Sequence, residues 1–465
     1  MAVSIGLMGL GVIGQALALN IAGRGFAVHG YDPSEAARAR AQGAGLPVFA
    51  DVAALVASLP RPRQIMLSVP AGEPVDAAIA SLRPLLTPGD LIADLGNSHY
   101  RETVRRGETL TVAGLHFLGI GVSGGEAGAR SGPAIMAGGP PAAWARLGPA
   151  LEAAAARYQG EPCCALVGPG GAGHFVKMVH NGIEYAVMQL IAETYDLANR
   201  GLGMDDGAIG ALFTRWNDGP LASYLVQSTG RILALRDERT GGPLLDSIDD
   251  AAGQKGTGAW ASMAALELGV PATLLATAVF ARGLSADKRD RAALLPVFGG
   301  TPAGTAQGLT ADSLLQALTC GVLAAYAQGF DLIRAGSDAQ GWQVERVTVA
   351  RIWRAGCIIR SAFLGPIAEA FGRLPPDATL LSDGVIAGRV KPALPGLRAA
   401  VAGGASAGVP TPCLGAALAM LDSAASARLP TRLIQAQRDF FGRHGFRRTD
   451  AEGTFHLAAG SGQDA

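Results

Sequence analysis

Charge is scarce in this sequence of 465 residues: Lys, Arg, Asp and Glu together make up 16% of the chain, against roughly 25% in an average soluble protein. Hydrophobic residues make up 49%, so much of the chain must be buried. The 38 basic residues balance the 38 acidic ones. Because the chain has no net charge to attract nucleic acid or an anionic membrane, we expect neither as a partner. An anionic ligand would have to meet positive charge that is concentrated locally.

Cysteine is also scarce, and its spacing excludes two kinds of site. The cysteines form neither a C-x-x-C pair nor another metal-ligand spacing. We therefore expect no metal site, and we expect reduced, mostly buried thiols, as in a cytoplasmic protein. The cysteines are Cys163, Cys164, Cys320, Cys357 and Cys413.

Long unbroken apolar runs are missing as well. The nearest approach is the first segment, MAVSIGLMGLGVIGQALALNIAGRG, but glycines interrupt it and Asn20 and Arg24 close it. A signal peptide needs a basic start, and a membrane span needs about 20 consecutive apolar residues. We expect neither in this segment.

The length suggests two or three domains, and the pattern of the sequence changes along the chain. Up to about Val167, short apolar runs alternate with helical segments, which predicts a parallel sheet with helices on both faces. Beyond Gly173, Ala- and Leu-rich stretches with a period of 3.6 residues predict helices. We expect an α/β domain over residues 1–174, a large all-α domain over 175–430, and a C-terminal tail over 431–465 that starts helical and becomes irregular. The strands are expected in SIGLMG, FAVHGYD, QIMLSVP, DLIADLG and GLHFLGIG.

The segment GLMGLGVIG carries a cofactor-binding motif. Gly9, Gly11 and Gly14 stand in G-x-G-x-x-G spacing directly after the first expected strand and open the first expected helix. Such glycines permit a tight turn, close approach of the backbone to a pyrophosphate, and close packing of the helix on the strand. In this context the motif predicts a Rossmann-type dinucleotide-binding domain.

An acidic residue follows at the separation that this motif requires. The strand in FAVHGYD ends at Asp32, where a carboxylate can accept hydrogen bonds from the adenosine ribose hydroxyls. A carboxylate here repels the 2′-phosphate of NADP, and the adjacent Pro33 offers no cation to bind it. The sequence therefore favours NAD. In the alternative interpretation Asp32 caps the helix expected in PSEAARAR, and the two roles do not exclude each other.

Two further segments carry polar groups at positions where ligands bind. Asn97 and Ser98 follow the end of an expected strand, the edge at which α/β sheets hold ligands. The run Ser123, Gly124 and Gly125 offers a hydroxyl and unobstructed backbone N–H groups, which suit a carboxylate. A turn that binds no ligand is the alternative for this run.

A polar stripe marks the helix expected over residues 173–201. Lys177, His180, Asn181 and Glu184 are spaced at i, i+3, i+4 and i+7, so they share one face of the helix within an arc of roughly 100°. The other faces of this helix are largely apolar. Helical spacing alone indicates only that four polar groups share one side of a largely apolar helix.

The order of these segments resembles that of the 6-phosphogluconate dehydrogenase family, the decarboxylating enzymes of the pentose phosphate pathway. The resemblance covers nearly the whole chain and rests on GNSHYR, GVSGGEAGAR, GHFVKMVHNGIEY, LLDSIDDAAGQKGTGAW, VFAR, WRAGCIIRSAFL and LIQAQRDFFG. It implies that 6-phosphogluconate is oxidised and decarboxylated to ribulose 5-phosphate and carbon dioxide while NAD(P) is reduced, without a metal. It also implies a cytoplasmic homodimer in which the tail of each subunit completes the other subunit's site.

The resemblance assigns roles to individual residues. It implies Lys177 as the general base and Glu184 as the general acid. The residues implied to hold the substrate hydroxyls and carboxylate are His180, Asn181, Asn97, Ser123, Gly124 and Gly125. Those implied to hold the phosphate are Tyr185, Lys255, Thr257, Arg282 and, from the tail of the other subunit, Arg438 and His444. The residues implied to contact the cofactor are Gly9, Gly11, Val12, Ile13, Gly14, Tyr31, Asp32, Val69, Pro70, Ala71 and Asn97.

The chemistry of this reaction fits the stripe on the helix. Oxidation of a secondary alcohol needs a base, and Lys177 can serve only when burial lowers its pKa enough to leave it neutral. Once protonated, it can polarise the keto group of the 3-keto acid, which then loses carbon dioxide. Glu184 can protonate C1 if burial raises its pKa. The two side chains start about 10 Å apart along the helix and can converge on adjacent substrate carbons.

The sequence departs from NADP-using members of this family, many of which have Arg in place of Pro33, Ala in place of Gly11 and Lys in place of Pro70. Together with Asp32, these differences predict NAD over NADP by at least about tenfold, which requires only ~1.4 kcal/mol. Two other functions stay open: a 3-hydroxyacid dehydrogenase that does not decarboxylate, and a catalytically silent NAD-binding protein. The phosphate-binding set argues against the first, and the presence of every reactive residue argues against the second.

Overall fold

The computed structural model describes residues 4–254, 256–299, 306 and 308–457. The chain forms two compact units, Met1–Ala417 and Leu418–Ala465, and each is described by itself. Lys255, one of the residues implied to hold the phosphate, lies outside the described residues.

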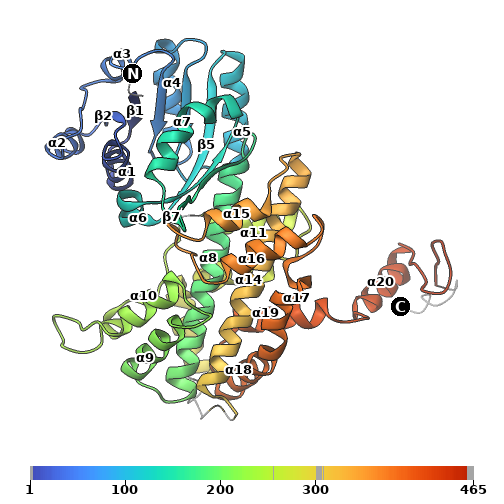
Figure 1. The fold of residues 1–465 in the computed structure, drawn as a ribbon. Coiled ribbons are helices and arrows are strands. Elements are labelled where there is room, and N and C mark those ends of the chain that lie inside the picture. The colour runs from blue at the N-terminus through green and yellow to red at the C-terminus, as the bar shows by residue number, and fades with distance from the viewer. Residues whose placement is uncertain (1–3, 255, 300–305, 307, 458–465) are drawn as a thin grey trace. The chain divides into compact units, whose positions relative to one another are not determined.

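The first unit begins with a seven-stranded sheet in the order β2-β1-β3-β4-β5-β6-β9 (Figure 1). All of the expected strands are present, and β1 to β5 pair with one another in parallel. The strands are β1 (Ser4–Met8), β2 (Ala27–Tyr31), β3 (Gln64–Leu67), β4 (Leu91–Asp94), β5 (His116–Ser123), β6 (Ala134–Gly138) and β9 (Cys164–Gly168). A separate two-stranded hairpin joins β7 (Arg157–Tyr158) and β8 (Glu161–Pro162).

The expectation of an all-parallel sheet is wrong at one edge. β6 runs antiparallel to β5, and β9 is parallel to β6. The chain between β5 and β6 holds only the short helix α6 (Gly125–Ser131). A parallel neighbour needs a crossover of a dozen or more residues, so this short connection returns the chain in the opposite direction.

Helices cover both faces of the sheet, as expected, and therefore bury its strands on both sides. The side chains of Ile5 and Leu7 belong to one apolar core, with residues of α1, α2, α6 and α7, whereas Ile65 and Leu67 belong to a second core, with residues of α3, α4 and α5. Alternate side chains of a strand point to opposite faces. These helices are α1 (Val12–Ala22), α2 (Glu35–Gly43), α3 (Val52–Ala57), α4 (Glu73–Leu82), α5 (Tyr100–Val112) and α7 (Pro141–Ala154).

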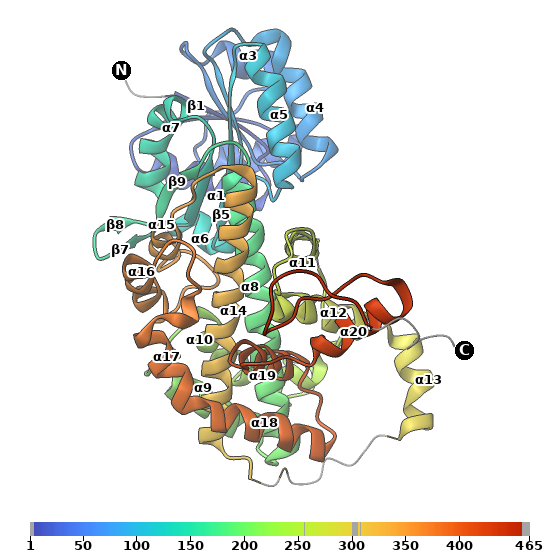
Figure 2. The ribbon, with the colours of Figure 1, turned by 90° about the vertical axis from the view of Figure 1, so that its right-hand side faces the viewer.

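Two long helices form the centre of the all-helical part: α8 (Ala172–Asp196) and α14 (Ala311–Gln340), which pack side by side (Figures 1 and 2). The helix expected over residues 173–201 thus ends its α-helical part at Asp196 and continues as a π-helical turn, Leu197–Gly201. The surrounding helices are α9 (Asp206–Asn217), α10 (Tyr224–Leu233), α11 (Thr257–Glu267), α12 (Thr273–Ala286), α13 (Lys288–Phe298), α15 (Arg346–Ile352), α16 (Leu364–Arg373), α17 (Gly384–Val390), α18 (Leu394–Ala407) and α19 (Pro412–Ala424).

The N-terminal end of α8 packs directly on the sheet, and glycines make this possible. A Cβ atom at Gly173 would lie 2.4 Å from the carbonyl oxygen of Gly119, and one at Gly121 would lie 2.3 Å from the Cβ of Lys177. Real Cβ contacts are never this short, so glycine at these positions lets the helix backbone approach β5. Lys177 is thereby held against the sheet that carries the dinucleotide motif.

The second unit contains the end of α19, then α20 (Thr431–Gly442) and a short folded segment after it. The carboxylate of Asp439 accepts hydrogen bonds from the backbone N–H groups of Gly445 and Leu457 and pairs with Nδ1 of His456. Phe446 and Phe455 exchange two backbone hydrogen bonds. The tail therefore has local order that its polar, irregular sequence did not indicate. In the part of the chain that the structure describes, no helix has both the length and the apolar character needed to span a bilayer.

Candidate active site

The glycine motif forms a tight turn between β1 and α1. Gly9 has a φ of +95°, and a Cβ atom there would lie 2.3 Å from the carbonyl oxygen of Ser68; a Cβ at Gly14 would lie 2.0 Å from that of Gly9. Both positions therefore require glycine. A Cβ at Gly11 would meet nothing within 4 Å, and Val12 and Ile13 at the start of α1 are exposed. The turn leaves the N-terminus of α1 open to a phosphate group.

Asp32 follows β2 and braces this turn. One carboxylate oxygen accepts a hydrogen bond from the backbone N–H of Leu10 at 2.7 Å, and the other accepts one from Ser34 at 2.8 Å. The interpretation of Asp32 as the cap of the next helix is wrong, because Ser34 is the N-cap of α2 and its side chain accepts from Ala37. Tyr31, just before Asp32, accepts the N–H of Gly9 on its carbonyl oxygen.

A cation that the sequence analysis did not consider lies beside Asp32. The guanidinium of Arg38 donates to the carbonyl oxygen of Asp32 at 2.7 Å and to that of Pro33 at 3.0 Å. The position of Arg38 near the start of α2 could have indicated this contact, because a long side chain near the N-terminus of a helix can reach back to the preceding loop. Positive charge therefore lies beside the loop of Asp32 and Pro33, which the sequence alone had shown without a cation.

Two loops at the carboxyl ends of β3 and β4 lie against each other. Val69, Pro70 and Ala71 follow β3, and the exposed Asn97 follows β4. A Cβ atom at Gly96 would lie 3.1 Å from the carbonyl oxygen of Val69, so the loops touch through their backbones. This contact brings the residues expected to meet the cofactor next to Asn97.

Three residues of the polar stripe on α8, Lys177, His180 and Asn181, are buried, and the stripe is bonded to two other elements. His180 contacts the hydroxyl of Ser123, at the end of β5, with 3.1 Å between Nε2 and Oγ. Its Nδ1 lies 3.1 Å from Oδ1 of Asn181, whose Nδ2 donates to Oγ1 of Thr257 at 3.0 Å. Because that amide oxygen can only accept, Nδ1 carries the proton and Nε2 accepts from Ser123. The stripe thus joins β5, α8 and the start of α11.

The turn after Ser123 contains two glycines with positive φ. Gly124 has a φ of +128°, and a Cβ there would lie 2.5 Å from the carbonyl oxygen of Gly356. Gly125 has a φ of +62°, and a Cβ there would meet nothing within 4 Å. The first glycine is needed for packing, whereas the second leaves its backbone N–H group accessible.

Burial shifts the pKa values of the titratable groups in directions that suit proton transfer. It lowers the pKa of Lys177, although the carboxyl of Glu184 and the thiol of Cys357 oppose the shift. It raises the pKa of Glu184, against the opposing charges of Lys177 and Arg282. Burial, and then the charge of Lys177, lower the pKa of His180 well below its usual value. Desolvation disfavours each charged form, so the site favours an uncharged imidazole, a less basic amine and a more basic carboxyl.

Arg282 lies beside Tyr185, the residue that follows Glu184 on α8. The guanidinium of Arg282 stacks over the ring of Tyr185 at 3.4 Å from its centroid and donates to the carbonyl oxygen of Gly253. A Cβ at Gly258 would lie 2.6 Å from the same ring. The structure therefore brings Tyr185, Thr257 and Arg282 together. Arg438 and His444 belong to the second unit, where both are exposed.

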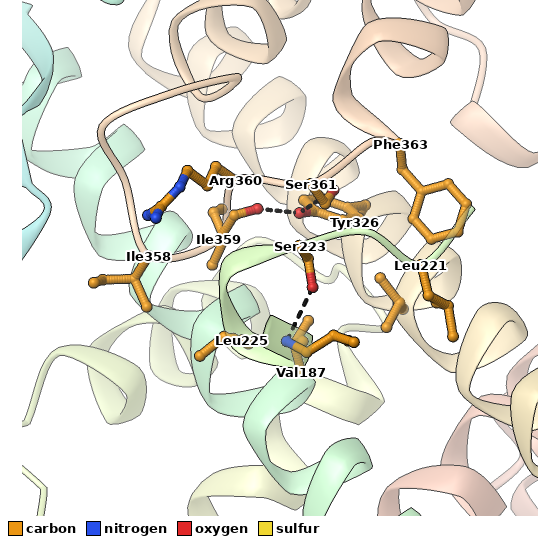
Figure 3. Close-up of a pocket in the computed structure, with 12 residues that line it drawn as sticks. Val187, Leu221, Ser223, Leu225, Tyr326, Ile358, Ile359, Arg360, Ser361 and Phe363 are labelled. Carbon is orange, nitrogen blue, oxygen red and sulfur yellow. Dashed lines mark hydrogen bonds between the residues drawn. The ribbon is translucent and has the colours of Figure 1, made fainter. Parts of the chain in front are cut away.

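A small cavity lies farther along α8 (Figure 3). It has a volume of about 10 Å³ and lies between Val187 and the segment 358–361, which leaves room for about one water molecule. The hydroxyl of Tyr326 donates to the carbonyl oxygen of Ile359 and also bonds Ser361. This cavity is a packing feature and is too small for a sugar phosphate. Among the described residues, no group of three or more His, Cys, Asp or Glu side chains is arranged to hold a metal ion.

Together these features define a class of protein. A dinucleotide turn at the end of β1, two loops beside it, and a buried amine with a half-buried carboxyl on the adjoining helix are the parts of a nicotinamide-dependent dehydrogenase with a helical substrate domain. The model for the NAD binding domain of 6-phosphogluconate dehydrogenase matches residues 4–168, and that for the 6-phosphogluconate dehydrogenase C-terminal domain matches residues 173–459. The chain belongs to the 6-phosphogluconate dehydrogenase family.

Individual relatives agree with this assignment over their whole length. The chain is 45% identical over 461 residues to an NAD(+)-dependent, decarboxylating 6-phosphogluconate dehydrogenase of Bacillus subtilis, covering 97% of this chain and 98% of the relative. An NADP(+)-dependent enzyme of the same organism is 44% identical over 459 residues, with the same coverage. The structure of Plasmodium falciparum 6-phosphogluconate dehydrogenase superposes with a TM-score of 0.93 at 38% identity, covering 98% of this chain and 99% of that one. Overall identity therefore does not decide between the two cofactors.

Proposed function

We propose that this protein oxidises and decarboxylates 6-phosphogluconate to ribulose 5-phosphate and carbon dioxide, the decarboxylating step of the pentose phosphate pathway. The observation that carries the proposal is the pair of the buried Lys177 and the half-buried Glu184 on α8, in which desolvation lowers the pKa of Lys177 and raises that of Glu184. One group is thereby suited to accept a proton near neutral pH and the other to donate one. The names of the relatives and the P. falciparum complex with 6-phosphogluconate support this choice of substrate.

The dinucleotide, when bound, accepts the hydride from C3 of the substrate. The turn at Gly9 to Gly14 and the N-terminus of α1 would hold its pyrophosphate, and Asp32 its ribose. Lys177 takes the proton of the C3 hydroxyl as that carbon is oxidised. Because the amine is then charged and buried, it donates a hydrogen bond to the new keto oxygen and polarises it.

The polarised carbonyl makes loss of carbon dioxide possible. The electron pair of the C1–C2 bond moves into a C2–C3 enol as carbon dioxide leaves, and the keto oxygen keeps the proton supplied by Lys177. Glu184 then delivers a proton to C2 of the acid, which becomes C1 of the pentulose, while Lys177 takes back the proton of the enol oxygen and the ketone forms again. The raised pKa of Glu184 allows it to hold that proton near neutral pH.

Polar groups around the pair would orient the substrate. His180 and Asn181 would hold the hydroxyls, and Ser123 with the nest at Gly124 and Gly125 would receive the carboxylate. The hydrogen bonds from His180 to Ser123 and from Asn181 to Thr257 support this assignment, because they fix both side chains before a ligand arrives. The phosphate would bind Tyr185, Thr257 and Arg282, joined by Lys255.

We propose NAD as the preferred cofactor and NADP as the weaker one. The carboxylate of Asp32 at the ribose position supports this preference, whereas the nearby guanidinium of Arg38 limits it. Asp32→Ala should bring the two kcat/KM values closer together, and Arg38→Ala should further reduce the use of NADP. Equal kcat/KM for NAD and NADP in the unaltered protein would contradict the preference.

A second copy of the chain is the proposed partner, in a homodimer. Large apolar side chains are exposed on α12 and α20, among them Phe280 at 74% and Phe441 at 73%. Exposed apolar surface of this kind commonly marks an interface. Arg438 and His444, from the tail of the other copy, would complete the phosphate site. The cytoplasm is the proposed compartment, in keeping with five free, buried cysteines.

One assay tests the reaction and separates it from its rivals. Purified protein is mixed with 6-phosphogluconate and NAD, and both NADH absorbance and release of carbon dioxide are followed. We expect equal molar amounts of the two products. NADH without carbon dioxide would indicate a non-decarboxylating 3-hydroxyacid dehydrogenase, and neither product would indicate a silent binding protein.

A further inference from the structure

Beneath the two loops that flank the proposed nicotinamide position lies a buried arginine that the proposed mechanism does not use. Arg106 is on α5, and its side chain is 1% exposed. α5 lies beside α4 on one face of the sheet (Figure 2). A buried guanidinium is costly unless its charge is paired. Nε and Nη2 of Arg106 are hydrogen-bonded, whereas Nη1 makes no hydrogen bond and faces only an ion-pair partner.

The guanidinium reaches the first loop through α4. Nε and Nη2 donate to the two carboxylate oxygens of Asp76 at 3.0 and 2.8 Å, a forked pair. Nη2 also donates to the carbonyl oxygen of Gly72 at 3.0 Å. Gly72 directly follows Val69, Pro70 and Ala71, so the arginine holds the end of the loop that carries the expected cofactor contacts.

The same guanidinium reaches the second loop through Asp94. Nη1 lies 3.9 Å from one carboxylate oxygen of this fully buried residue. Asp94 in turn accepts from the backbone N–H of Gly96 at 2.9 Å and from the hydroxyl of Ser98 at 2.6 Å. These two hydrogen bonds fix the residues on either side of Asn97. The position of Asn97 therefore depends on a carboxylate whose neutralising charge is Arg106.

The helix α5 also connects this network to α8. Thr103, one turn before Arg106, bonds Nδ1 of the buried His174 through its hydroxyl at 2.6 Å. His174 precedes Lys177 by one turn of α8. One buried helix face thus contacts both cofactor loops and the start of the helix that carries the proposed base.

We propose that Arg106 is a positioning residue that holds residues 69–72 and 96–98 in register, so that the cofactor and Asn97 meet the substrate in a productive geometry. This inference rests on the proposed function for its effect on turnover, but its effect on dinucleotide binding is independent of the substrate. Removing the charge would leave Asp94 buried without a counter-charge, so the informative change keeps the charge and removes the fork. Lysine is a point charge that cannot contact Asp76, Gly72 and Asp94 at once.

The test compares Arg106→Lys with Arg105→Lys. Arg105 bonds the same carboxylate of Asp76 at 2.8 Å, but its side chain is 58% exposed and has no bond to either loop. For Arg106→Lys we expect kcat to fall at least about tenfold and the Kd for NADH, measured by fluorescence without substrate, to rise at least about fivefold. For Arg105→Lys both should stay within about twofold of the unaltered protein. Thermal unfolding of each variant establishes that it is folded at the assay temperature.

A purely structural role would lower the melting temperature of Arg106→Lys and leave kcat and Kd of the folded protein within twofold of the control, which would overturn the proposal. If this variant does not fold, Ser98→Ala tests the same connection, with Ser81→Ala as its control because the Ser81 hydroxyl bonds only its own helix at Ala78. We expect kcat to fall at least about threefold for Ser98→Ala alone, and equal values for the two serine variants would refute the proposal. Absence of turnover in the unaltered protein would refute the proposed function, while the NADH binding data would still decide the role of Arg106.

Discussion

Replacing Lys177 by methionine isolates the chemical role of its amine. The side chain is buried, and its stem packs on Gly121, where a Cβ atom would lie 2.3 Å from the Cβ of Lys177. Methionine has a similar length and fills this space without a cavity, so we expect the stability to change by less than about 1.5 kcal/mol. The variant should fold normally and should lack only the group that takes the proton and polarises the carbonyl.

The expected loss of rate follows from two separate contributions. A positioned general base typically contributes about 10²- to 10⁴-fold. A hydrogen bond from a charged donor contributes about 1.5 to 3 kcal/mol, which is about another 10- to 100-fold in rate. We therefore expect kcat of Lys177→Met to fall by at least about 10³-fold, while the dissociation constants for NADH and 6-phosphogluconate stay within a few-fold.

The pH dependence provides an independent check on the same residue. A lysine with an ordinary pKa is only about 0.1% neutral at pH 7.5, and burial lowers the pKa of Lys177, which raises that fraction. In the unaltered protein kcat/KM should therefore rise with pH until the lowered pKa is passed, and the variant should lack this limb. The measurements are steady-state NADH formation from pH 6 to 10 and isothermal titration of both ligands. A kcat within tenfold of the unaltered value, with ligand binding intact, would remove Lys177 from the role of base.

The other predictions concern a proton donor, a buried carboxyl and the dimer. Glu184→Gln should lower kcat by about 100-fold and abolish the fall in kcat at high pH, because burial raises the pKa of Glu184 and the protonated form is lost as pH rises through it; an unchanged profile would contradict this. Burial raises the pKa of Glu193 from 4.5 to about 7, so its contribution to stability is complete below pH 4.5 and is lost by pH 7, up to about 3 kcal/mol. The melting temperature of the unaltered protein should therefore fall between pH 4.5 and 7. If the melting temperature of Glu193→Gln fell equally steeply with pH, Glu193 would not be the cause. Phe280→Glu should shift light scattering toward the monomer mass, and a dimer mass at micromolar concentration would exclude α12 from the interface.

Much of the Rossmann-type half was predictable because its signals are local. Gly9, Gly11 and Gly14 lie within six residues at the junction of β1 and α1, and the strands before and after them are short apolar runs. The structure of each of these elements is therefore set by residues close in the sequence. The antiparallel strand β6 (Ala134–Gly138) was not anticipated. Its direction depends on the length of the connection from Ser123 rather than on its own residues, and periodicity carries no information about direction.

The limits of local signals are clearest around Asp32 and Asp94. The sequence predicted a ligand role for Asp32, but it did not show that the carboxylate also bonds the N–H of Leu10, 22 residues away, or that Arg38 folds back on the same loop. The partners of Asp94 could not be predicted from the sequence, because an acidic residue at the end of a strand has several possible partners. Only the packing of α5 on the sheet brings Arg106 to it.

The sequence by itself determined which groups are available and their order along the chain. Helical spacing puts Lys177, His180, Asn181 and Glu184 on one face, since the geometry of a helix is set by its own backbone. Tertiary structure decided what that face meets. Close approach at Gly121 and Gly173 buries the stripe against the sheet, and contacts with Ser123 and Thr257 orient it. The pKa shifts follow from this burial, because desolvation depends on what surrounds a group in space and not on its neighbours in the chain.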